Sequence, residues 1–213
     1  MKVAILSESP ADEAAVKVLI EALLGAQIEA VPVRARSRGF PAAVNLVAPT
    51  LKALHYQRQA DALIVVVDSD NSVVHQANHG PSASDAEKCR HCQLAAKIKD
   101  IKAELRPIPD YPEIETAIAV APPSIEAWYL FERDSRCTEA GWRQRQSEGV
   151  NSRADILRLK TMAYGTDRPD IVSEKEHAVE HAKRLATKLA AFEEFFPNSF
   201  GLLAEAVRNW SVS

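Results

Sequence analysis

Two aspartates stand at the end of the most apolar segment of the sequence. Residues 63–67 read LIVVV, and Asp68 and Asp70 follow with one serine between them. A near-continuous β-branched run is typical of a strand buried on both faces of a parallel sheet. Because Asp and Ser are good turn residues, the strand could simply end in a solvated turn. The alternative is a divalent-metal site, because adjacent carboxylates with no basic neighbour in sequence are neutralised by a cation.

Two further acidic residues follow predicted strands. Glu8 comes after the apolar residues 2–7, and Glu126 lies in the first turn of a helix that follows residues 115–120. In an open parallel sheet, ligands bind at the carboxyl ends of the strands. Carboxylates gathered there repel one another unless a cation lies between them, and all-oxygen ligation suits Mg²⁺ or Mn²⁺. Each glutamate alone is equally explained as a charge near a helix N-terminus, so their joint placement carries the prediction.

Strand and helix patterns alternate over residues 1–134. Strands are predicted at 2–7, 27–33, 62–67 and 115–120, and helices at 10–24, 40–59, 86–105 and after Ser124. This order predicts an α/β fold with an open, mostly parallel four-stranded sheet flanked by helices. Residues 135–213 are predicted to form a helical extension or small subdomain packed on the sheet. Within it, residues 137–151 are expected to be irregular, and helices are expected at 152–162 and 173–189. Residues 192–210 are expected to be helical with an interruption near Pro197.

Composition excludes several classes of protein. The 213 residues are 46% hydrophobic, which is enough for one sizeable core. The net charge of −3 gives no global reason for nonspecific nucleic-acid binding. No window approaches the roughly 18 apolar residues of a membrane span, and the N-terminal MKVAILSESP turns acidic before a signal-peptide core could form. Three cysteines are too few for a disulfide framework. We therefore expect a cytoplasmic protein with no membrane partner.

A basic segment follows the second predicted strand. Arg34, Arg36 and Arg38 in VRARSRGF are predicted to lie near the same sheet edge as the carboxylates. Arginine is suited to bidentate contact with phosphate, so these side chains could hold a nucleic-acid strand over the metals. An exposed loop whose charges aid solubility explains them equally well.

Histidines and cysteines gather in the segment that follows Asp70. His75 and His79 are spaced H-x3-H, and Cys89 and Cys92 are spaced C-x2-C. Two such pairs can form a tetrahedral Cys2His2 site for structural Zn²⁺. Free thiols and histidines are the alternative.

Three motifs resemble the Toprim domain, which topoisomerases, primases and the overcoming-lysogenization-defect (OLD) family of nucleases share. They are an apolar strand that ends in Glu before an alanine-rich helix (ILSESPADEAAVKVLIEALL), a hydrophobic strand that ends in DxD (LIVVVDSD), and PPSIEAWYLFERD. The third is similar to the E-A-W element of small stand-alone Toprim-like proteins of the DUF4276 type, which are often found near phage-defence genes. The resemblance covers about the first 134 residues in order of elements.

The resemblance implies a Mg²⁺-dependent nuclease acting on DNA or RNA. Glu8, Asp68 and Asp70 would be metal ligands and catalytic residues, and Glu126 an auxiliary catalytic acid. Metal ions in such a site activate water and stabilise the leaving oxygen. A partner ATPase and a homodimer are further expectations. One departure is that Ser9 and Pro10 follow Glu8, where nuclease members of the family usually have glycine.

That departure leaves a second function open, a catalytically silent Toprim-like binding or regulatory module that acts with a partner protein. A receiver-like phosphoacceptor domain fits less well, because neither paired acids after the first strand nor a lysine after a fifth strand is evident.

Overall fold

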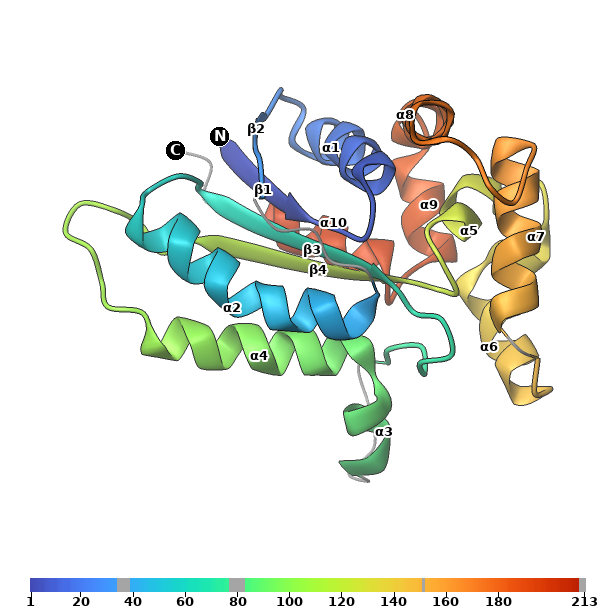
Figure 1. Cartoon of the computed structure of the whole chain (residues 1–213), viewed down its shortest axis with the longest axis horizontal. Coiled ribbons are helices and arrows are strands. Elements are labelled where there is room, and N and C mark those ends of the chain that lie inside the picture. Colours follow the sequence, from blue (N-terminus) through green and yellow to red (C-terminus); the bar gives the residue numbers. More distant parts are fainter. Residues whose placement is uncertain (34–38, 77–82, 151, 211–213) are drawn as a thin grey trace.

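The sheet of this computed structural model has four parallel strands in the order β2-β1-β3-β4. Residues 1–33, 39–76, 83–150 and 152–210 are described. The strands are β1 (Lys2–Leu6), β2 (Glu29–Val31), β3 (Ala62–Asp68) and β4 (Glu115–Ala121). The predicted α/β class with a parallel four-stranded sheet is confirmed, although β2 is shorter than the predicted 27–33 (Figure 1).

Helices cover both faces of the sheet. Helices α2 (Phe40–Tyr56) and α4 (Arg90–Glu104) cover one face, and α1 (Pro10–Leu24), α8 (Ile171–Ala186) and α10 (Phe200–Arg208) lie on the other (Figure 1). The remaining helical elements are α3 (Ala83–Lys88), α5 (Glu126–Leu130), the 3-10 helix η1 (Ser135–Cys137), α6 (Glu139–Ser147), α7 (Ser152–Tyr164) and α9 (Leu189–Phe195). None of the helices in the described ranges is long and apolar enough to cross a membrane.

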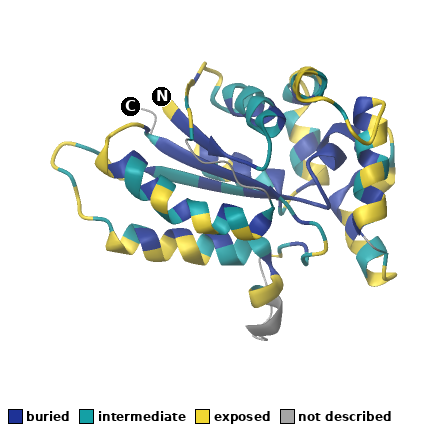
Figure 2. Cartoon of the chain, in the orientation of Figure 1, coloured by how far each residue is buried: buried dark blue, intermediate teal, exposed yellow. Residues whose placement is uncertain are grey.

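Strand β3 contributes to two hydrophobic cores at once. Ile64 and Val66 pack on the side of α1, whereas Leu63, Val65 and Val67 pack on the side of α2 and α4. Successive side chains of a strand point to opposite faces, so a strand covered on both faces needs an apolar residue at every position. Figure 2 shows this burial along the length of β3. The LIVVV run is therefore explained by two-sided burial.

The residues that depart from the Toprim pattern begin α1. Ser9 has an extended backbone, and its Oγ accepts a hydrogen bond of 3.1 Å from the backbone N of Asp12. Pro10 is the first helical residue, where its missing N–H costs nothing. Ser9 and Pro10 thus form a helix-start signal directly after β1.

Two segments differ from the sequence-based expectation. The predicted helix 86–105 is broken, because Cys89 is extended and separates α3 from α4. The expectation of irregular structure over 137–151 is wrong for most of that range. It contains α6, which begins at Thr138, whose Oγ1 accepts a hydrogen bond of 3.0 Å from the backbone N of Gly141. This cap stabilises a helix with little apolar periodicity.

Aromatic residues join the C-terminal helices to the sheet. Trp128 of α5 is fully buried, and its ring lies 5.5 Å from that of Phe192 and 5.8 Å from that of Phe200. These residues belong to the same hydrophobic cluster as the α1 side of the sheet. The cluster fixes α5, and therefore Glu126, beyond the carboxyl end of β4.

Candidate functional site

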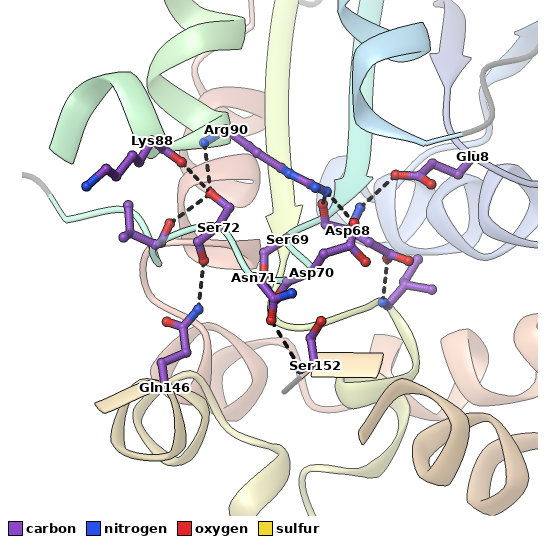
Figure 3. A network of polar contacts seen from close by, with 12 residues as sticks. Glu8, Asp68, Ser69, Asp70, Asn71, Ser72, Lys88, Arg90, Gln146 and Ser152 are labelled. Carbon is purple, nitrogen blue, oxygen red and sulfur yellow. Dashed lines mark hydrogen bonds and ion pairs between the residues drawn. The ribbon is translucent and has the colours of Figure 1, made fainter. Parts of the chain in front are cut away.

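Glu8 and Asp68 meet at the carboxyl ends of β1 and β3, which are neighbouring strands. The backbone N of Asp68 donates a hydrogen bond of 3.3 Å to Glu8 Oε1 (Figure 3). Asp68 Oδ1 accepts a hydrogen bond of 2.9 Å from the backbone N of Ile125, which lies in the connection from β4 to α5. Asp68, at the end of β3, is therefore held both by Glu8 after β1 and by the connection from β4 to α5.

Asp70 is held in place by the backbone of the neighbouring strand end. Its φ is 47°, in the left-handed region, and its N donates a hydrogen bond of 2.9 Å to the carbonyl of Pro123. Its carboxylate forms an ion pair with Arg90, with Oδ2 2.8 Å from Nη1 (Figure 3). The same Nη1 donates a hydrogen bond of 2.6 Å to the carbonyl of Asp68. Arg90 thus neutralises Asp70 from the first turn of α4, although no basic residue is close to Asp70 in sequence.

Glu126 lies in the first turn of α5 and is almost completely buried, with 2% of its surface exposed. Its Oε1 is 3.7 Å from Lys160 Nζ of α7, and the described residues offer no hydrogen-bond partner to Oε2. Desolvation raises the pKa of Asp68 well above its usual range, and repulsion from Glu126 and Glu8 adds to this effect. A buried carboxylate without a full set of partners is costly unless a cation or a proton compensates it.

Asp12 adds a carboxylate that the motifs do not reveal. It lies in the first turn of α1, and burial together with repulsion from Glu126 raises its pKa to about 8. Burial and the nearby Asp70 raise the pKa of Glu8 as well. Burial also raises the pKa of Glu174 on α8, against the opposing charge of Lys160. Several carboxyl groups with raised pKa values therefore lie at one edge of the sheet, where a proton or a cation would relieve their mutual repulsion.

The three carboxylates predicted as metal ligands do not form a compact triad. The described part of the chain contains one group of three His, Cys, Asp or Glu residues whose ligand atoms all lie within 4.8 Å of one another, and it does not include Glu8, Asp68 or Asp70. The side chain of Asp70 turns towards Arg90 instead. The proposed assignment of these residues to Mg²⁺ therefore stays a prediction.

An open cleft of about 760 Å³ lies beside Asp70. Lys88, Arg90 and Arg153 bring positive charge to it, and Phe40 and Leu157 are among its apolar lining residues. The cleft lies between α7 and residues 68–73, here called the DxD loop. Figure 3 shows this connection: Asn71 Oδ1 accepts a hydrogen bond of 3.1 Å from the backbone N of Ser152. A cationic, partly apolar cleft next to carboxylates can accept a phosphate ester.

The compact group of ligand atoms consists of His75, Cys89 and Cys92. His75 Nδ1 lies 3.5 Å from the Sγ of Cys89 and 3.5 Å from the Sγ of Cys92. The rings of His75 and His91 are in contact, with centroids 4.2 Å apart. This cluster can bind a metal ion.

Several predicted residues lie outside the described part of the chain. They are Arg34, Arg36 and Arg38, predicted to bind substrate, and His79, predicted as a zinc ligand. Conversely, sequence reasoning missed Asp12 and Arg90 at this edge, and it named Lys160 only as a basic contact of the helical tail or an exposed helix residue. Asp12 carries the signal of an N-terminal helical acid, and nothing local distinguishes Arg90 or Lys160 from exposed helix residues.

Comparisons of the chain with protein-family models, curated proteins and solved structures find no match.

Proposed function

We propose that this protein is a Mg²⁺- or Mn²⁺-dependent nuclease that hydrolyses phosphodiester bonds at the carboxyl edge of its sheet. One observation carries the proposal. Glu8, Asp68, Asp12 and Glu126 converge there from different elements. Asp70, which follows Asp68 by two residues, lines an open cleft together with Lys88, Arg90 and Arg153. The raised pKa values and the unpartnered Oε2 of Glu126 fit a site that receives a cation.

The residues divide the chemistry as follows. Glu8 and Asp68 would hold Mg²⁺, with Asp70 joining them once a phosphate competes for Arg90. Glu126 and Lys160 would set the charge behind the site. A bound Mg²⁺ would supply an activated water and stabilise the leaving oxygen. Lys88, Arg90 and Arg153 would bind the phosphodiester in the cleft.

The wider assignments follow the resemblance to the Toprim domain. Under this proposal the protein is cytoplasmic and DNA-binding or RNA-binding, and it acts in phage defence. A partner ATPase and a homodimer belong to the same proposal. We also propose that Zn²⁺ is the ion of the His75, Cys89 and Cys92 cluster, because zinc prefers thiolate and imidazole donors and Mg²⁺ prefers oxygen.

The experiment is a cleavage assay with matched variants. The purified chain is incubated with supercoiled plasmid, single-stranded DNA and RNA, with Mg²⁺, Mn²⁺ or EDTA. Asp68→Asn should abolish metal-dependent cleavage and still accept the hydrogen bond from Ile125 N. Asp61→Asn is the control, because Asp61 lies directly before β3, at the amino end of the strand and away from the candidate site. Equal cleavage by both variants would point to a contaminating nuclease and contradict the proposal.

A specific observation favours the second candidate, a catalytically silent regulatory module. The chain's own Arg90 already neutralises Asp70, one of the proposed ligands. A silent module would neither cut any of the three substrates nor bind Mg²⁺ measurably by calorimetry. Metal-dependent cleavage that is lost in Asp68→Asn excludes it.

A further inference from the structure

The cluster of His75, Cys89 and Cys92 connects two segments that form the candidate site. His75 lies in the loop that continues from Asp70, whereas Cys89 precedes α4 and Cys92 lies in its first turn. Cys89 is buried, and the other two side chains are partly exposed. An ion bound here would therefore join the DxD loop to the start of α4.

The two Sγ to Nδ1 distances in the cluster match those around a tetrahedral zinc ion. With Zn–S of about 2.3 Å and Zn–N of about 2.0–2.1 Å, two such ligands of a tetrahedral ion lie about 3.6 Å apart. Both measured Sγ to Nδ1 distances are 3.5 Å. As hydrogen bonds, the two contacts would have to share the single proton or single lone pair of Nδ1. An ion between the three atoms accounts for both.

Arg90 ties this cluster to the DxD loop, because it stands between the two cysteines in sequence. Its guanidinium contacts Asp70 and the carbonyl of Asp68, and it lies over the ring of Phe40, 4.7 Å from the centroid. Its backbone N donates a hydrogen bond of 3.2 Å to Ser72 Oγ (Figure 3). The backbone position of Arg90 is thus set by the same short segment that carries both thiols.

We propose that His75, Cys89 and Cys92 bind one Zn²⁺, which holds the loop after Asp70 against the start of α4 and keeps Arg90 on the two aspartates. These side chains would fill three of the four positions of the tetrahedral ion, and the group includes none of the carboxylates proposed to hold the hydrolytic metal. In the free protein Arg90 positions the loop after β3 through Asp70 and the carbonyl of Asp68, and under the proposed function a bound phosphate would compete with Asp70 for it. The zinc site and its effect on the loop are independent of the proposed nuclease function. Only the importance of the loop for catalysis rests on that function.

Metal analysis of the purified full chain tests the ligand set. We expect about one zinc per chain for the wild type, and less than about a tenth of that for His75→Ala and Cys92→Ser. His177→Ala and Cys137→Ser are the matched controls, because these residues lie outside the cluster. Co²⁺ substituted for zinc should give the absorption bands of a tetrahedral thiolate complex. A zinc-free wild type with no Co²⁺ bands, or His75→Ala with full zinc content, would overturn the proposal.

Hydrogen exchange tests the effect on the loop without an activity assay. Removal of zinc by a chelator should speed amide exchange in residues 69–76 and 88–93 about tenfold or more, and leave β1 unchanged. Arg90→Ala should keep its zinc and loosen residues 68–72. Unchanged exchange after zinc removal would overturn the role of the ion. The remaining alternative is a disulfide between Cys89 and Cys92, which thiol titration of the denatured chain would detect. Three reactive thiols are expected, and a single one would overturn the proposal.

Discussion

The raised pKa of Asp12 predicts that the metal-free protein becomes less stable as the pH rises. In the folded chain the pKa of Asp12 is about 8, against 3.8 for an aspartate in water. Between these values the folded carboxyl group keeps a proton that the unfolded group has lost. Unfolding therefore releases a proton, and the free energy of unfolding falls as the pH rises from about 4 to about 8.

The magnitude follows from the size of this shift. Each pH unit within the window changes the free energy of unfolding by up to about 1.4 kcal/mol for one carboxyl group. Raising the pH from 5 to 7 should therefore cost up to about 2.7 kcal/mol from Asp12. For a chain of this size that corresponds to a fall in Tm of about 5–10 °C.

The assay is thermal unfolding by circular dichroism at pH 5, 6, 7 and 8 in EDTA. Asp12→Asn removes the titrating group, so the difference between wild type and variant isolates it from other groups. One such group is His181, whose pKa burial lowers and whose effect on stability has the opposite sign. Asp167→Asn, at an exposed position, is the control and should follow the wild type. Saturating Mg²⁺ should flatten the wild-type curve, because a cation held by Glu8 and Asp68 would offset the repulsion that raises the pKa of Asp12.

A clear result would refute the reasoning. If Asp12→Asn and the wild type lose Tm equally between pH 5 and 8, Asp12 is ionised in both states and the carboxylates are not crowded as the structure indicates. Asp12→Asn should instead be the more stable protein at pH 8. A functional site is expected to behave in this way: removing a carboxylate that its neighbours repel stabilises the fold.

Two further predictions concern the framework that holds the site. Phe192→Ala should cost about 3–5 kcal/mol in urea denaturation, because the ring is fully buried and stacks 3.9 Å from Phe200; a similar loss in the exposed Phe195→Ala would contradict this. Ser9→Ala should cost about 1 kcal/mol through loss of the α1 cap, whereas Ser9→Gly should cost only a few tenths; equal losses would show that the cap is not the cause.

Much of the fold could be predicted from local patterns. Residues 63–67 indicated a strand covered on both faces, because only an apolar side chain at every position suits two cores. The alternation of strands and helices indicated the parallel sheet, since parallel neighbours need a crossover between them. The helix α6 was missed because its start depends on the Thr138 cap and its sequence lacks a clear apolar stripe.

The candidate site was only partly predictable. The sequence by itself determined that Glu8 and Asp68 follow strands, and parallel strand ends meet at one edge, so their contact follows. Only the tertiary structure decided that Arg90 pairs with Asp70 and that Lys160 lies 3.7 Å from Glu126. The physical reason is that these contacts depend on how α4 and α7 pack against the strand ends, and packing joins residues far apart in the chain. Local periodicity records which face of a helix is buried, and it carries no information on which distant charge that helix brings to the site.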